Sequence, residues 1–500
     1  MFNPESTSQL DHVAAAEESA AAGDQDRALR VLDVVLAKPD HLEFGAAVRI
    51  AAAIHAHRGM LHRSAELYRL VPSESIGDDA GAAVITMIGT GDVEGSRSML
   101  AAAAQGSATS VASSMRLMAH GLEQTLSGDG SGAYSTLVQG VSSMAPVGRE
   151  VIVQDTPASL AALVAINLGE LDLAVTVLHR AIEIELGGLM FRDRHRVLLA
   201  WTMMLRGDLT GAREQADAVL TEGGEDLRNE LFAHAVRVGV ARRTSDISAL
   251  AETWHAARGV LPGHSVDLFS LLPLGELAVA AARLRDDHQI RPQLDAASAL
   301  LDALGNPPLW SGTFHWYGVQ AAILAEHPPD LIPHADALVG AARISRHAGL
   351  LARAGQTWLR ILQDDVDPDS VRQSVQDLDS IGLSWEASRL AAQAAARTTD
   401  RQDMLDLLNA ARSVQRFSTP GAASCAGGSH GALTEREWEI ASHVVQGIGY
   451  REIGQRLFIS PKTVEHHVAS IRRRLGSTSR QDMLATLKRL VEATDPAGTD

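Results

Sequence analysis

One short pattern recurs along the first half of the chain at a nearly fixed spacing. A glycine, in most copies followed by an acidic residue, precedes a small residue, usually alanine, by about five positions. Successive glycines lie 32 to 41 residues apart. The six copies are Gly23-Asp24…Ala28, Gly59…Ala65, Gly91-Asp92…Ser96, Gly128-Asp129…Ala133, Gly169-Glu170…Ala174 and Gly207-Asp208…Ala212.

Each part of this pattern has a physical role in a pair of helices. Glycine can end a helix in a left-handed conformation, and an acidic residue after it suits the start of the next helix. The small residue lets the two helices approach closely. Helical hairpins that repeat every ~34–40 residues form α-solenoids with a long concave surface suited to binding. We therefore expect an all-α protein whose residues 1–417 form an α-solenoid of helical hairpins.

The repeated phrase resembles a degenerate tetratricopeptide repeat, although the Trp, Tyr and Pro positions of the full consensus are not filled in any copy. Weaker versions continue at 243–251 and 382–391. The pairs Pro262-Gly263, Pro307-Pro308 and Pro328-Pro329 interrupt the second half, and we interpret them as loops between helices. The resemblance implies a sensor or interaction domain but does not name what it binds.

Composition narrows the classes of protein further. The single cysteine, Cys425, excludes an internal disulfide and a zinc site built from several cysteines. The first eleven residues lack a secretory pattern, and no apolar run reaches the ~18–20 residues that span a membrane. We expect a cytoplasmic, nucleoid-associated protein that does not bind membranes.

Motifs for catalysis or phosphate binding are missing from the sequence. The nearest glycine-rich stretch, 89–98, lacks the Gly-Lys-[Ser/Thr] ending of a phosphate-binding loop and falls on a repeat boundary. No serine-elbow motif is present. We expect no catalytic residues, no cofactor and no enzymatic activity.

Clusters of charged and histidine residues in the body are interpreted as structural. His55 and His57 point to different sides of one helix, and His62 follows on the next, so we expect no metal site there. The same holds for the cluster 286–288. The run 191–196, which reads Phe-Arg-Asp-Arg-His-Arg, is interpreted as a solvated helix start.

Charge and composition change near the C-terminus. Residues 418–432 hold four glycines and one proline but no acidic residue, which is typical of a flexible linker. Residues 431–491 carry ten Lys and Arg against six Asp and Glu, whereas the whole chain has a net charge of -17. A small basic head on an acidic body is expected when one segment meets phosphate.

The head, residues 433–492, contains residues that typically begin and end short helices. Thr434 and Glu437 form a capping box, and Gly447 is placed to end the first helix. A second helix follows from about Tyr450. Ser460 and Pro461 open a third helix, on which Val464, Val468, Ile471 and Leu475 recur on one face. The expected core positions are Trp438, Ala441 and Val445 on the first helix, and Ile453 and Leu457 on the second.

Rotation by about 100° per residue places a polar face opposite the apolar face of the third helix. Lys462, His466, Ala469, Ser470 and Arg473 point outward on it. A helix with such a face, preceded by a short helix and a tight turn, has the geometry that enters the major groove of DNA.

This segment resembles the LuxR-type (GerE-like) helix-turn-helix domain. The resemblance runs through Leu433-Thr434-x-Arg436-Glu437, Gly447, Glu452-Ile453, Leu457-x-Ile459-Ser460-x-Lys462-Thr463-Val464-Glu465-x-His467, Ile471-x-x-x-Leu475-Gly476 and Arg480. It implies a four-helix domain that binds DNA through its third helix and forms a homodimer through its fourth, here about 479–493. Gly449 stands where the family usually has a serine cap.

The resemblance also implies roles for particular residues. It puts Lys462, Thr463 and His467 at or near the DNA backbone, and Glu465, His466 and Ala469 where they meet bases. The layout is similar to the C-terminal portion of the large ATP-dependent LuxR-type regulators, whose repeat domain senses a ligand or partner protein. The ATPase module of those regulators has no counterpart in this sequence.

We therefore expect a sequence-specific transcription regulator that binds double-stranded DNA. In this interpretation residues 1–417 sense a protein or small-molecule effector, 418–432 are the linker, 433–492 bind DNA and 493–500 form a disordered tail. The alternative is a repeat-protein adaptor whose C-terminal module binds protein instead of DNA.

Overall fold

The computed structural model describes residues 4–417 with short gaps, and 13 positions of the C-terminal segment. The gaps are 104–106, 108, 148–150, 223–225, 245 and 326–327. The C-terminal positions are 441, 443–445, 448–450, 452–453, 464, 468, 484 and 487. Contacts divide the chain into two units, Met1–Pro420 and Gly421–Asp500.

Every regular element in the described part of the chain is a helix, which confirms the all-α prediction. The α-helices are α1 (Pro4–Ala21), α2 (Gln25–Leu36), α3 (Phe44–His57), α4 (Leu61–Arg69), α5 (Ala80–Gly89), α6 (Val93–Ala103), α7 (Ser110–Leu126), α8 (Gly130–Met144), α9 (Pro157–Leu168), α10 (Leu171–Glu183), α11 (Leu189–Leu205), α12 (Leu209–Glu222), α13 (Leu227–Arg243), α14 (Ile247–Val260), α15 (Leu271–Arg283), α16 (Arg291–Ala303), α17 (Pro308–Ala325), α18 (Pro328–Ala341), α19 (Arg346–Leu362), α20 (Pro368–Ser380), α21 (Ser384–Arg397) and α22 (Arg401–Phe417). The 3-10 helices are η1 (Gly77–Asp79), η2 (Leu261–Gly263), η3 (Leu268–Ser270) and η4 (Asp287–Gln289).

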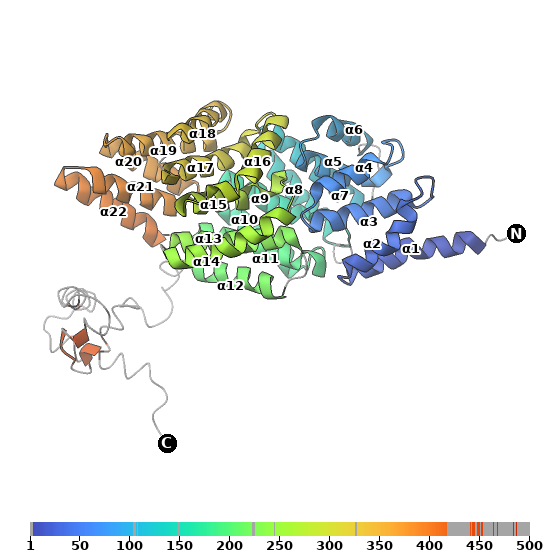
Figure 1. Cartoon of the computed structure of the whole chain (residues 1–500), viewed down its shortest axis with the longest axis horizontal. Helices are drawn as coiled ribbons and strands as arrows, with labels where there is room; N and C mark the ends of the chain where they lie inside the picture. The colour runs from blue at the N-terminus through green and yellow to red at the C-terminus, as the bar shows by residue number, and fades with distance from the viewer. Residues whose placement is uncertain are drawn as a thin grey trace, which may run out of the picture. The chain divides into compact units, whose positions relative to one another are not determined.

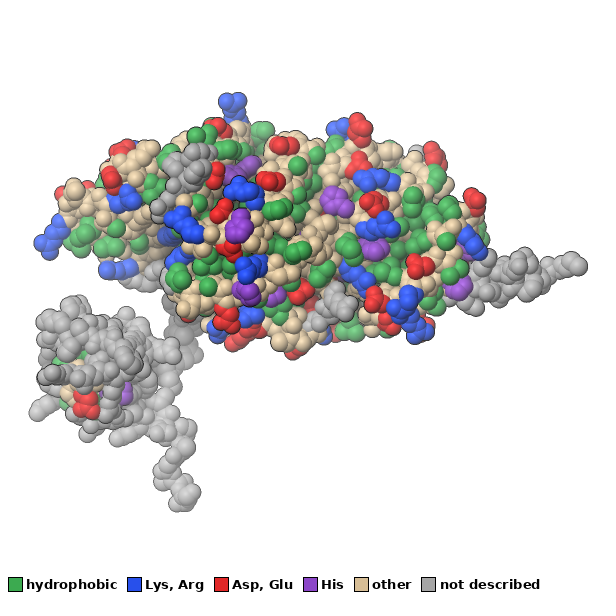
Figure 2. Space-filling view, in the orientation of Figure 1, with side chains coloured by type: hydrophobic (Ala, Val, Ile, Leu, Met, Phe, Trp, Pro, Cys, Tyr) green, Lys and Arg blue, Asp and Glu red, His purple; other side chains and the backbone are tan. Residues whose placement is uncertain are grey.

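The first unit is a succession of helical hairpins, from hairpin 1 (α1 and α2) to hairpin 11 (α21 and α22) (Figure 1). Odd-numbered helices form an inner layer in which, from α5 onward, each packs on the next odd-numbered helix. All ten residues of α5 are buried, and so are Pro157–Asn167 of α9. A helix that is buried all round has protein on every side. Even-numbered helices lie outside, and on the face shown in Figure 2 acidic and basic side chains are interspersed.

The predicted turn chemistry is confirmed. All six predicted glycines have left-handed φ values between 71° and 89°. The four aspartates that follow a predicted glycine each accept a hydrogen bond from the amide three residues on, at 2.9 to 3.0 Å, and so cap the next helix. All six predicted small residues are buried between the paired helices. Of the proline pairs, one falls in η2 and two mark the starts of α17 and α18.

Hairpins that are five places apart in the sequence contact each other, so successive turns of the superhelix stack directly on one another. The Ser265 amide, in the connection after hairpin 7, donates to the Gly59 carbonyl of hairpin 2 at 3.1 Å. Trp310 Nε1 of hairpin 9 donates to Thr125 Oγ1 of hairpin 4 at 2.9 Å. The sequence predicted a long concave surface, whereas in the structure the inner layer packs against the next turn.

The connection between α8 and α9 runs through this interior. Residues Ile152–Thr156 are buried although they form no helix. A buried connection needs partners for its backbone polar groups. The Val153 carbonyl lies 3.0 Å from His57 Nε2, and the Gln154 carbonyl accepts from Arg228 Nη1 at 3.0 Å. This segment therefore joins α3 of hairpin 2 to α13 of hairpin 7.

Asp155, in the same segment, is the centre of a buried charge cluster. Its Oδ2 accepts from Arg194 Nη2 at 3.0 Å and from Arg228 Nη1 at 3.2 Å. Burial by itself raises the pKa of Asp155, but the two guanidiniums outweigh it and lower the pKa to about 2. Asp226, 3.6 Å from His57 Nδ1, supplies a second carboxylate beside Arg228. Opposite charges are thus matched inside the body.

The interpretation of 191–196 as a solvated helix start was wrong for its key residues. Phe191, Arg194 and His195 are at most 1% exposed. His195 Nε2 lies 2.8 Å from Thr156 Oγ1, and the Phe191 ring makes a T-shaped contact with the imidazole of His57. The density of charged residues in this run predicted that it is exposed to solvent. The partner that makes burial of Arg194 favourable, Asp155, lies 39 residues away in the sequence.

A second buried cluster links hairpins 7, 8 and 11. Arg242 of α13 makes a bidentate pair with Glu276 of α15, at 2.6 and 3.0 Å. Arg243 bonds both Glu276, at 3.1 Å, and Glu386 of α21, at 3.4 Å. The Trp385 ring lies against both guanidiniums, with the Arg242 Cζ 4.6 Å from its centroid. Two arginines and two glutamates therefore balance one another.

Gly169→Ala should destabilise the body more than Gly23→Ala. Both glycines have left-handed φ, which costs a residue with a side chain about 1 kcal/mol. A Cβ at 169 would also lie 2.6 Å from the Ile381 carbonyl oxygen of hairpin 10, whereas nothing lies within 4 Å of one at 23. Thermal unfolding followed by circular dichroism should show the larger loss for Gly169→Ala. Equal losses would contradict the stacking of turns.

His195→Gln should make the stability of the body less sensitive to acid. Burial lowers the pKa of His195 to about 4, whereas the unfolded chain protonates this residue near 6.5. Between these values the unfolded state binds the extra proton, so the free energy of unfolding falls as the pH is lowered. The contribution is about 2 kcal/mol between pH 7 and pH 5.

The measurement compares unfolding midpoints at pH 7 and pH 5. Wild type should lose more stability on acidification than His195→Gln, whose amide can still bond Thr156. His288→Gln is the matched control, because the His288 side chain is 70% exposed. If His195→Gln lost as much stability between pH 7 and pH 5 as wild type, the assignment of this pH dependence to His195 would be refuted.

Candidate nucleic-acid interface

The described residues of the second unit form a small apolar core. Its buried members come from four stretches of sequence: Ala441, Val444, Ile453, Val464, Val468 and Leu487. Four further side chains are partly buried and pack against them: Val445, Ile448, Tyr450 and Leu484. Each described stretch is helical where these core residues lie, apart from Ile448. Segments spaced along almost 50 residues thus meet in one core.

The end of the first helix and the start of the second have the predicted geometry. The amide of Ile448 donates to the carbonyl of His443 at 3.1 Å, the bond that closes a helix through a glycine-type cap. The amide of Ile453 donates to the carbonyl of Gly449 at 2.9 Å. Gly449 is therefore the cap residue of the second helix, which begins at Tyr450 as predicted.

Val464 and Val468 confirm the predicted apolar face of the third helix. They are 0% and 8% exposed and lie one helical turn apart. Their partners in that prediction, Ile471 and Leu475, lie outside the described residues. Ala441 and Ile453 are completely buried, as expected for the core positions of the first two helices.

The residues predicted to contact DNA lie outside the described part of the chain. They are Lys462, Thr463, Glu465, His466, His467, Ala469, Ser470 and Arg473. The capping residues Thr434, Glu437, Ser460 and Pro461, the linker 418–432 and the tail 493–500 also lie outside it.

Two histidines of the cluster 55–62 bond backbone carbonyls within the fold. His57 bonds the buried Val153 carbonyl, and His62 Nε2 lies 3.0 Å from the Val266 carbonyl. Asp286 accepts from Trp254 Nε1 at 2.8 Å. Among the residues with described positions, no cluster of three His, Cys, Asp or Glu side chains could hold a metal ion. No helix in this same part of the chain is long and apolar enough to cross a membrane.

One feature of the body was not predicted from the sequence: a cavity of about 270 Å³ between α15, α16, α17 and α18. Of its lining, only Asp287 had been singled out. A signal was present in the spacing of small residues at 275, 278 and 282 of α15 and at 318, 321, 322 and 325 of α17. These recur every three or four residues, so they share one helix face and leave a hollow beside it.

Comparison with known proteins separates the two units. The family described as "Bacterial regulatory proteins, luxR family" matches residues 431–486. The oxygen regulatory protein NreC of Staphylococcus aureus, in strains JH9 and JH1, is 40% identical over 62 residues. That match covers 12% of this chain and 29% of NreC, so the chain spans less than a third of the length of these relatives.

For the helical body, a crystal structure of the P58(IPK) TPR domain is similar over 83% of this chain and 99% of that chain. Its sequence identity is 12% and its TM-score is 0.18, which does not establish a shared superhelix. The match that carries weight is the C-terminal one, where the core residues described above fall within or beside the matched range. Residues 431–486 of this chain are a domain of the luxR family of bacterial regulatory proteins.

Proposed function

We propose that this protein is a DNA-binding transcription regulator, with the third helix of its luxR-family domain as the reading element. The observation that carries the proposal is the buried pair Val464 and Val468 within the matched range. Continued as a helix, residues 462, 466, 469, 470 and 473 fall on the side opposite this pair. The similarity to NreC, an oxygen regulatory protein, supports this role.

The charge distribution supports the same function. The whole chain has a net charge of -17, yet 431–491 hold four more basic than acidic residues. Phosphate contacts supply most of the sequence-independent affinity for DNA. In the proposed arrangement Lys462, Thr463 and His467 contact the backbone, and Glu465, His466 and Ala469 face base edges. Dimerisation through the fourth helix would pair two such units.

The helical body is the proposed sensor of a ligand or partner protein. A chain of hairpins that occupies over four fifths of the sequence offers far more surface than DNA binding requires. Its buried charge clusters fix how distant hairpins meet, so a ligand that favours one arrangement could shift the whole unit.

Lys462→Ala should weaken binding to every DNA sequence by a similar factor. Loss of one phosphate contact should reduce the slope of log affinity against log salt by about 1. The full chain is first used to select a binding sequence from random-pool DNA, and affinities are then measured over a range of salt concentrations. Lys38→Ala, a change of the same kind at an exposed site in the body, should leave the slope unaltered.

His466→Ala should change sequence preference while leaving the salt slope close to that of wild type. A side chain that reads a base edge contributes discrimination of about 1–3 kcal/mol against the wrong base. Selection from random-pool DNA should show relaxed preference at one base position. If neither variant alters DNA binding, the third helix is not the reading element. Failure of the wild-type chain to enrich any sequence favours an adaptor that binds protein.

A further inference from the structure

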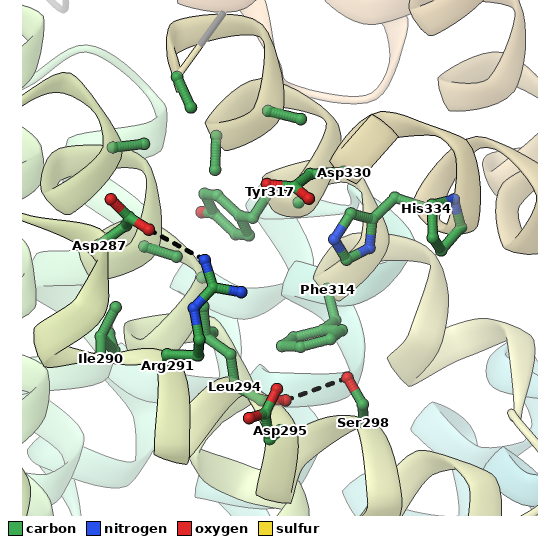
Figure 3. Close-up of a pocket in the computed structure, with 18 residues that line it drawn as sticks. Asp287, Ile290, Arg291, Leu294, Asp295, Ser298, Phe314, Tyr317, Asp330 and His334 are labelled. Carbon is green, nitrogen blue, oxygen red and sulfur yellow. Dashed lines mark hydrogen bonds and ion pairs between the residues drawn. The ribbon is translucent and has the colours of Figure 1, made fainter. Parts of the chain in front are cut away.

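The cavity of hairpins 8 and 9 has a floor of small residues and walls of larger ones. Gly275, Ala278 and Ala282 of α15, together with Gly318 and Ala321 of α17, form the floor. The outer helices α16 and α18 border it on two sides (Figure 3). At about 270 Å³ it lies just below the ~300 Å³ at which ligand pockets usually begin. It therefore suits a small organic molecule and excludes a folded peptide.

Aromatic side chains line one side of the hollow. Phe314 and Tyr317 extend from α17, and the imidazole of His334 lies beside them (Figure 3). The rings of Phe314 and His334 are edge to face, with centroids 6.4 Å apart. His334 packs against Gly318, where a Cβ would lie 2.5 Å from the imidazole. A glycine at 318 therefore holds the aromatic wall close to the floor.

Carboxylates dominate the charge of the lining. Asp287, Asp295 and Asp330 border the cavity, against a single guanidinium, Arg291. Arg291 Nη2 is held by Asp287 Oδ2 at 2.9 Å. Burial lowers the pKa of His334, so its imidazole is neutral at pH 7. The formal charges of the lining therefore sum to -2, and the guanidinium of Arg291 is paired with Asp287.

We propose that this cavity binds a small organic cation with an aromatic or apolar body. The body would lie on the alanine floor beside Phe314 and Tyr317, where cation–π attraction adds to apolar burial. The ammonium group would lie toward Asp295, and its charge would offset part of the negative charge of the lining. An anion would meet repulsion from the carboxylates. Binding of such a cation does not depend on the proposed regulatory function. Only the interpretation of the ligand as a regulatory signal rests on that function.

The test uses the full chain and three probes of matched shape. Phenethylammonium, 2-phenylethanol and phenylacetate share a phenyl ring and differ in charge. Ligand-observed NMR titrations at pH 7.5 give the dissociation constants. The ammonium probe should bind about fivefold or more tightly than the alcohol, and phenylacetate should bind least.

Variants locate the binding site. Asp295→Asn should weaken binding of the ammonium probe by about two- to fivefold, as expected for a charge pair with an exposed carboxylate. Asp336→Asn is the matched control, because Asp336 is exposed on α18 and does not line the cavity. Ala321→Phe should fill the hollow and weaken binding more than tenfold, with circular dichroism confirming an intact fold.

The proposal is overturned if the ammonium probe shows no saturable binding, if the alcohol or phenylacetate binds as tightly, or if Ala321→Phe keeps wild-type affinity in a folded protein. These titrations contain no DNA, so they do not depend on the proposed regulatory role. Selection of DNA by the chain, measured separately, decides that role whatever the cavity binds.

Discussion

The buried carboxylate of Asp155 determines how the helical body closes on itself. It holds Arg194 of hairpin 6 and Arg228 of hairpin 7, while the residues before it bond hairpin 2. A buried ion pair adds little net stability compared with well-packed apolar residues, but removing one partner typically costs about 3–5 kcal/mol. The cluster therefore mainly determines which arrangement of hairpins is favoured, because any arrangement that separates these groups leaves a buried charge without its partner.

Stacking of turns changes what a helical-repeat body can offer a ligand. An open solenoid binds along its concave face. Here the buried connection 152–156 occupies that interior, and both it and the connection 264–267 are bonded to hairpin 2. Binding sites then depend on local gaps between outer helices. The gap between α16 and α18 exists because α15 and α17 present glycine and alanine there, where larger side chains would fill the space.

Local features of the fold could be predicted from sequence because their causes are local. The glycine, aspartate and alanine of each repeat act within a few residues of one another, and so do Val464 and Val468. The pairing of hairpins could not be predicted, because the paired residues are far apart in the sequence. Arg194 lies 39 residues from Asp155, and Arg228 lies 73 residues from it. A run such as 191–196 looks solvated until its partner is known. The cavity likewise depends on α15 and α17, which are separated in the sequence by η4 and α16.

The cavity is connected to the end of the body through bonded side chains. Helix α15, which forms part of its floor, also carries Glu276, and Glu276 bonds Arg243, which bonds Glu386 of α21. Hairpin 11 is the last described element before the luxR-family domain in sequence. A ligand can influence that domain only if it binds two arrangements of hairpin 11 with different affinity. The Glu276–Arg243–Glu386 contact is where two such arrangements would differ, because moving α21 alone would separate Glu386 from its guanidinium while leaving Glu276 paired.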